Sequence, residues 1–211
     1  MPVPYERFAG WTAVAVGLGG FLYSLFFVIY LNNGSNTAAT LADLLLMGAG
    51  FGVTAVLIAV FRRLRETDAG FALFAVLLGV VGAAGSGLHG GYDLAVQVKN
   101  PAGTVSDLAA NPTDPRGLAT FALAGLSLLL ISWLIVAGAD LPRRLGYLGL
   151  LGGVLLVVIY VGRLTVFNPK NPFLLTVAVV SGFVVNPAWF AWLGMVLLRG
   201  RPRALLRSAT G

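Results

Sequence analysis

The sequence predicts an all-α membrane protein, a bundle of six transmembrane helices with both termini in the cytoplasm. Of the 211 residues, 58% are hydrophobic and only 10% are charged, whereas an ordinary soluble domain carries about 25% charged residues. Six apolar segments have the roughly 20 residues that a helix needs to cross the hydrocarbon core. The basic residues gather in alternate connections between these segments. Together these observations exclude a soluble domain and a disordered chain.

The six predicted crossings span about residues 8–31, 38–61, 71–92, 118–138, 147–167 and 173–198. Each is rich in Leu, Val, Ala, Phe and Gly and is apolar nearly all the way round, which favours lipid-embedded helices. Barrel strands would be about 10 residues long with alternating polarity, and no segment alternates in this way. The first crossing is too long for a cleavable signal peptide, so we expect it to remain as an anchor.

Basic residues orient the crossings. The larger group lies in the connections of one side and consists of Arg7, Arg62, Arg63, Arg65, Arg143, Arg144, Arg199, Arg201, Arg203 and Arg207. The opposite side has Lys99, Arg116 and Lys170. Because cytoplasmic connections carry an excess of Lys and Arg, both termini are predicted to be cytoplasmic. The net charge of +6 therefore indicates contact with the anionic surface of the lipid bilayer, and no nucleic-acid partner is expected.

Two segments outside the crossings, and the scarcity of metal-binding residues, carry further predictions. Residues 99–117 hold three prolines among polar residues, which predicts an irregular, exposed loop. The basic tail after Arg199 is expected either to lie on the inner lipid surface or to be solvated. Cysteine is absent and His89 is the only histidine, so no metal site and no cofactor held by such ligands is expected.

Glycines are expected to hold the helices together, because close backbone approach replaces hydrophobic burial in lipid. In the third crossing Gly79, Ala83, Gly87 and Gly91 recur at a spacing of four. This stripe predicts that the third helix is central in the bundle, or that it serves self-association. Five glycines between Gly82 and Gly91 also predict that the outer end of this helix bends or unwinds.

Polar residues within the crossings form the candidate binding site. An ionisable group at the centre of a membrane helix costs about 2.5–3.5 kcal/mol on insertion scales. Asp43 lies near the outer mouth of the second crossing, and Ser86, His89 and Asp93 share one face of the third. Arg163 lies sixteen residues into the fifth crossing. All four ionisable groups are therefore predicted at a similar depth in the outer leaflet.

Two interpretations of this group stay open. In the first, Arg163 neutralises one aspartate in a structural ion pair and His89 hydrogen-bonds the other. In the second, the group lines an outward pocket in which Arg163 anchors an anion or a headgroup, and His89 and Asp93 exchange protons. Further inside, Asn186–Pro187 lies midway along the sixth crossing. We expect a kink or a hinge there, with Asn186 bonding the carbonyls that proline frees.

The last hundred or so residues carry two short motifs, from Pro142 to Gly146 and Trp192-Leu193-Gly194. In these motifs the chain resembles the second half of small bacterial multi-pass membrane proteins of unknown function. The resemblance implies a bacterial inner membrane and no particular reaction.

The sequence thus favours a non-enzymatic membrane protein that binds a small or amphipathic molecule, or a partner subunit, through the outer pocket. One alternative is a membrane enzyme acting on a lipid or isoprenoid, with His89 and Asp93 as acid and base. The other is a structural subunit of a larger membrane complex, docked through its glycine stripes and apolar faces.

Overall fold

The computed structural model describes residues 4–99, 117–166 and 171–200, and all regular secondary structure in these ranges is helical. Within them, six helices are long and apolar enough to cross a membrane, which agrees with the prediction. The elements are α1 (Pro4–Asn33), α2 (Asn36–Leu64), α3 (Ala69–Lys99), η2 (Leu118–Leu123), α5 (Ala124–Ala137), α6 (Arg143–Thr165), α7 (Pro172–Val179), η3 (Val180–Val185) and α8 (Asn186–Arg199). Most of the predicted loop at 99–117 and the tail beyond Gly200 lie outside the described residues.

The segments η2 and η3 are single π-helical stretches that continue directly into α5 and α8. The fourth crossing is therefore η2 with α5, and the sixth is α7, η3 and α8 together.

Three helix starts are capped by polar side chains. At the start of α3 the carboxylate of Asp68 accepts the backbone N–H of Phe71 at 2.9 Å. Ser35 precedes α2, and its hydroxyl accepts the backbone N–H of Ala38 at 3.3 Å. Asn171 accepts two backbone N–H groups at the start of α7, where Pro172 occupies the first helical position. Such caps satisfy the donors that every helix leaves unpaired at its first turn.

The third crossing is longer than predicted. The sequence indicates an end near residue 92, whereas α3 continues to Lys99. Asp93 and Gln97 therefore lie inside the helix, one turn apart on the same face. This extension brings Gln97 into the candidate site described below.

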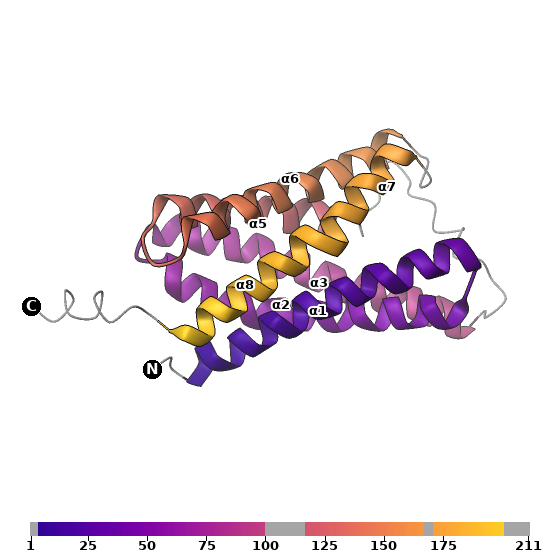
Figure 1. Cartoon of the computed structure of the whole chain (residues 1–211), viewed down its shortest axis with the longest axis horizontal. Coiled ribbons are helices and arrows are strands. Elements are labelled where there is room, and N and C mark those ends of the chain that lie inside the picture. Colours follow the sequence, from indigo (N-terminus) through magenta and orange to yellow (C-terminus); the bar gives the residue numbers. More distant parts are fainter. Residues whose placement is uncertain (1–3, 100–116, 167–170, 201–211) are drawn as a thin grey trace, which may run out of the picture.

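The crossings form a ring in chain order (Figure 1). α1 packs against α2 on one side and α8 on the other, α2 packs against α3, and α3 packs against η2 and α5. α5 packs against α6, and α6 contacts α7, η3 and α8, which closes the ring. None of the described helices occupies the centre, so the prediction that the third crossing is central is wrong.

The glycines of α3 explain its place in the ring, because they serve two neighbours. A Cβ at Gly90 would lie 2.5 Å from the carbonyl oxygen of Asp43 in α2, and a Cβ at Gly82 would lie 2.9 Å from the backbone nitrogen of Ala124 in α5. At Gly87, in the predicted stripe, the nearest atom is 3.9 Å away. Because these glycines allow close backbone approach to α2 on one side and to α5 on the other, α3 packs between these two helices and does not lie at the centre of the bundle.

The predicted unwinding between Gly82 and Gly91 is wrong, because α3 is continuous through this stretch. The irregular backbone lies in η2 and η3 instead. η3 ends directly before Asn186 and Pro187, the predicted hinge. Proline lacks the N–H that would bond the preceding turn, and a widened turn upstream is a usual way to accommodate that loss. The backbone irregularity is therefore close to the predicted position, and its role as a hinge stays a prediction.

The two ends of the ring are packed differently. We call the end where α1 begins and α8 ends the terminal end, and the opposite end the distal end (Figure 1). Buried aliphatic side chains fill the terminal half, the largest being Leu64, Leu134, Ile135, Leu145, Leu193 and Leu197. Toward the distal end this solid core gives way to a cavity.

Candidate ligand-binding cavity

A cavity of about 430 Å³ lies inside the ring and reaches from its distal end to beyond its middle. All six crossings line it, mostly with aliphatic and aromatic side chains. The polar lining residues are Tyr23, Ser24, Asp43, Ser86, His89, Asp93, Thr120, Ser127, Arg163, Ser181 and Asn186. Small-molecule sites typically measure about 300–1,000 Å³ and combine apolar walls with a few polar groups, so this cavity has the size and lining of such a site.

All five predicted binding residues line this cavity: Asp43, Ser86, His89, Asp93 and Arg163. Asp43 comes from α2, the next three come from α3, and Arg163 lies in the last turn of α6. Ser86 donates its hydroxyl to the carbonyl of Gly82, so its oxygen can still accept a hydrogen bond. The structure thus brings the whole group around one space.

Asp43 is held by a side chain that the sequence interpretation missed. Its carboxylate is buried and accepts a hydrogen bond from Nε2 of Gln97 at 2.6 Å. The Oε1 atom of Gln97 in turn accepts the hydroxyl of Thr40 at 3.0 Å. A buried carboxylate needs such donors, because an unpaired polar group is costly away from water. The available signal was the spacing of four between Gln97 and Asp93, which places both on one helical face.

His89 links α3 to η2 across the cavity wall. Its Nε2 lies 3.3 Å from Oδ2 of Asp93, and its Nδ1 lies 3.3 Å from Oγ1 of Thr120. A neutral imidazole has one donor and one acceptor nitrogen. The carboxylate favours the proton on Nε2, so that Nδ1 accepts the hydroxyl of Thr120. A hydroxyl, an imidazole and a carboxylate in a row can relay a proton.

Arg163 faces the aromatic ring that follows Thr120. Its guanidinium carbon lies 5.3 Å from the centroid of the Phe121 ring, within the range of a cation–π interaction. The position in the last turn of α6 is also favourable, because the C-terminal end of a helix carries partial negative charge. Neither Thr120 nor Phe121 was predicted, since nothing in an apolar segment shows which residues face inward.

The polar group also reaches the first helix. Tyr23 lies in α1 and lines the same cavity as Asp43, Asp93 and Arg163, so five of the six crossings contribute to this group. The ionisable residues therefore surround one space toward the distal end.

The predicted hinge residues Asn186 and Pro187 line the cavity at a deeper level. Asn186 donates its Nδ2 to the hydroxyl of Ser181 at 2.9 Å. This differs from the expectation that Asn186 bonds the carbonyls freed by the proline. Ser181 is buried within η3, so the pair adds a small polar layer in the middle of an otherwise apolar space.

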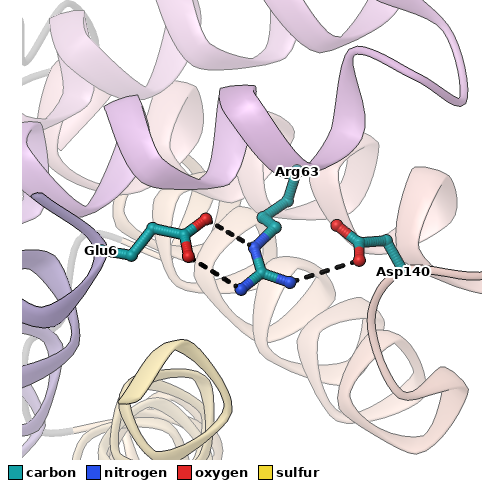
Figure 2. A network of polar contacts seen from close by, with 3 residues as sticks. All are labelled: Glu6, Arg63 and Asp140. Atoms are coloured by element: carbon teal, nitrogen blue, oxygen red, sulfur yellow. Dashed lines mark hydrogen bonds and ion pairs between the residues drawn. The ribbon is translucent and has the colours of Figure 1, made fainter. Parts of the chain in front are cut away.

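A second polar network lies at the terminal end (Figure 2). Arg63 is fully buried and donates Nε and Nη2 to the carboxylate oxygens of Glu6 at 2.9 and 3.1 Å. Its Nη1 donates to Oδ1 of Asp140 at 3.2 Å. The network joins the start of α1, the end of α2 and the connection after α5.

The prediction that Arg63 lies in a connection at the lipid surface is wrong, because α2 continues past it and turns it inward. The planar guanidinium suits two carboxylates at once, which compensates for the burial of its charge. Val60, which lines the cavity, is one helical turn before Arg63. The network therefore lies below the floor of the cavity, on its terminal side.

Comparisons of the chain with protein-family models, curated proteins and solved structures find no match. The geometry of the cavity and the distribution of charge are therefore the basis for the functional proposal.

Proposed function

We propose that this chain is a multi-pass membrane protein, in a bacterial inner membrane, that binds a small amphipathic molecule in the cavity of its ring. The observation that carries the proposal is the convergence of Asp43, Ser86, His89, Asp93 and Arg163 on one space of about 430 Å³. Polar groups lie near the distal end and apolar side chains line the rest. A molecule with a polar head and an apolar body matches both parts.

The charge distribution supports an orientation with the distal end outward. In the described residues, Arg7, Arg62, Arg65, Arg143, Arg144 and Arg199 belong to the terminal end, whereas Lys99 belongs to the distal end. The burial of Arg63 beside two carboxylates removes one residue from the predicted excess and leaves the bias intact. Cytoplasmic ends carry the excess of Arg and Lys, which would place the polar head of the ligand in the outer leaflet.

Ligand extraction tests the proposal. The protein is purified in a mild detergent and extracted with organic solvent, and the extract is compared by mass spectrometry with that of Ala49→Phe, which fills the cavity. We expect one amphipathic species to be enriched at least fivefold with the wild type. Ala49 lines the cavity, whereas Ala84 on α3 is exposed. Ala84→Phe is therefore the matched control and should retain the ligand.

Two results would contradict the binding function. One is that the wild type and Ala49→Phe yield the same copurified molecules in the same amounts, while Ala49→Phe and Ala84→Phe both melt at the temperature of the wild type. The other is an Arg163→Ala variant that loses stability without any change in copurified molecules, which is the behaviour of a structural ion pair. Migration of the native protein only as part of a larger assembly would favour the structural-subunit alternative.

The contacts of His89 favour a membrane enzyme as a second candidate. With Asp93 and Thr120 on its two ring nitrogens, His89 is oriented as an acid–base group in the cavity wall. Such a group would remove a proton from a lipid or isoprenoid and return it, with Asp93 stabilising the imidazolium. Proteoliposomes of a bacterial lipid extract in heavy water test this. Deuterium should enter a lipid with the wild type and not with His89→Gln, and incorporation at the background rate in both would exclude it.

A further inference from the structure

The seam between the first and the sixth crossing is packed near the terminal end and opens toward the distal end. α1 packs along α8 and also contacts η3, but it diverges from α7 toward the distal end (Figure 1). The cavity reaches this seam, because its lining includes Phe27, Val28 and Leu31 of α1 together with Leu175 and Val179 of α7. We call this opening, between Phe27–Leu31 and Leu175–Val179, the α1–α7 portal.

The rim of the portal is apolar. Phe27, Leu31, Leu175 and Val179 are each 39–41% exposed. Phe27 lies six residues before the end of α1, about 9 Å along the helix, so the rim is at the depth of the hydrocarbon. An exposed apolar rim is favourable against acyl chains and unfavourable against water. The portal therefore faces the lipid sideways.

The dimensions of the cavity limit what it can hold. Asp43 and Val60 both line it and are 17 residues apart on α2, about 25 Å by helical rise. One leaflet of the hydrocarbon core is about 15 Å thick, so the space is deep enough for an extended chain. A volume of about 430 Å³ lies in the lower part of the range of about 300–1,000 Å³ that is usual for sites holding one small molecule. An amphiphile with one hydrocarbon chain matches such a site better than a lipid with two chains.

We propose that the ligand is a single-chain amphiphile of the membrane, and that it enters sideways through the α1–α7 portal. Its chain extends toward Trp189 and Phe190 at the floor, and its head remains among Asp43, His89 and Arg163, whose hydrogen-bonding groups suit hydroxyl or ester oxygens. This inference rests on the proposed binding function. It adds the class of ligand and the route of entry.

Tryptophan fluorescence measures chain entry directly. Trp189 lines the cavity and is 3% exposed, so membrane lipid reaches it only through the cavity. Trp11, Trp133 and Trp192 are changed to Phe, and thermal melting confirms that the single-tryptophan protein is folded. Monoolein brominated on its chain should quench Trp189 at least threefold. Phosphatidylcholine with two brominated chains should leave its emission within about 20% of the unquenched value in the same vesicles.

Closing the portal tests the route. The chain contains no cysteine, so Val28→Cys with Ala178→Cys provides the only two thiols, one on each side of the portal. Joining them with a bis-maleimide should slow quenching by brominated monoolein at least tenfold. The two single-cysteine proteins, treated with the same reagent, should be quenched at the original rate.

Each outcome separates this inference from the binding function. Equal quenching by one-chain and two-chain lipids would overturn the ligand class, and unchanged rates after cross-linking would overturn the route. If neither lipid quenches Trp189 while the wild type still copurifies with a molecule that Ala49→Phe loses, the binding function stands and the single-chain inference fails. If there is neither quenching nor a copurified molecule, both fail.

Discussion

Arg63 and Glu6 are 57 positions apart in the sequence and form a pair of parallel hydrogen bonds in the interior of the terminal end. Arg63 also binds Asp140, so one cation holds three segments of the chain together. Removing one partner of a buried ion pair typically costs about 3–5 kcal/mol, because the remaining charge stays buried without compensation. We expect Arg63→Met to lower the free energy of unfolding by about this amount, measured by denaturant unfolding in detergent. Arg65→Met, at an exposed position two residues on, should change it by less than about 0.5 kcal/mol.

The same network allows a rescue experiment. Glu6→Met and Asp140→Leu, added to Arg63→Met, replace all three charged side chains with apolar side chains of similar size. Because replacing an entire buried charged network is often close to neutral, the triple variant should recover more than half of the stability lost by Arg63→Met. A triple variant that is less stable than the single one would show that the network does not act through charge compensation.

Glycine positions in the ring predict opposite effects of the same substitution. A Cβ at Gly90 would lie 2.5 Å from the backbone oxygen of Asp43 and 2.8 Å from the backbone nitrogen of Met47. Gly90→Ala should therefore push α3 away from α2 and cost about 1–3 kcal/mol. At Gly48 no atom lies within 4 Å, and Gly48→Ala should be neutral or stabilising by up to about 1 kcal/mol, as alanine favours helix. Thermal melting of the two variants in the same detergent measures the difference.

Gln97 is expected to matter more than its partner Thr40. Gln97→Leu removes the donor to the buried Asp43 and should cost about 1–3 kcal/mol, the range for a buried polar group left unsatisfied. Thr40→Val removes only the bond to the far side of Gln97 and should cost about half as much. Equal losses in unfolding free energy would show that Asp43 does not depend on Gln97.

The only histidine of the chain can be observed without assignment. Thr120 hydrogen-bonds Nδ1 of His89, so Thr120→Val should alter the ¹⁵N shifts of the imidazole and the balance of its two tautomers. Thr120→Ser keeps the hydroxyl and should leave the spectrum close to that of the wild type. NMR of protein labelled at histidine measures both. An unchanged spectrum in Thr120→Val would exclude the Asp93–His89–Thr120 relay that the second candidate function requires.

The sequence predicts the crossings well, because length and hydropathy alone determine whether a segment can span a membrane. Scarce charges in apolar segments likewise identified Asp43, His89, Asp93 and Arg163, which line one cavity. Charge is informative here since each such group has a high cost in lipid and needs a shared polar environment.

The unpredicted features depend on rotation and depth, which an all-apolar helix does not reveal. Thr120 and Phe121 belong to the π-helical segment η2 and line the cavity, and no pattern in the residues indicates that segment. Gln97 and Arg63 lie beyond the predicted ends of their crossings, because polar residues indicate that a crossing ends. The helical backbone continues past both predicted ends. The place of α3 in the ring also differs from prediction, because equal glycine spacing does not tell which flank a glycine serves.

The contact between α1 and α8 has a consequence for biosynthesis. The ring closes only when its first and last members meet, and these are the most widely separated helices in the sequence. During translation, the early helices are already in the bilayer while α8 is still being synthesised. Until α8 has been inserted, the polar residues of the later cavity are not covered by it. Truncated nascent chains should therefore be preferred targets for membrane proteases, and resistance should arise abruptly once the last helix has been inserted.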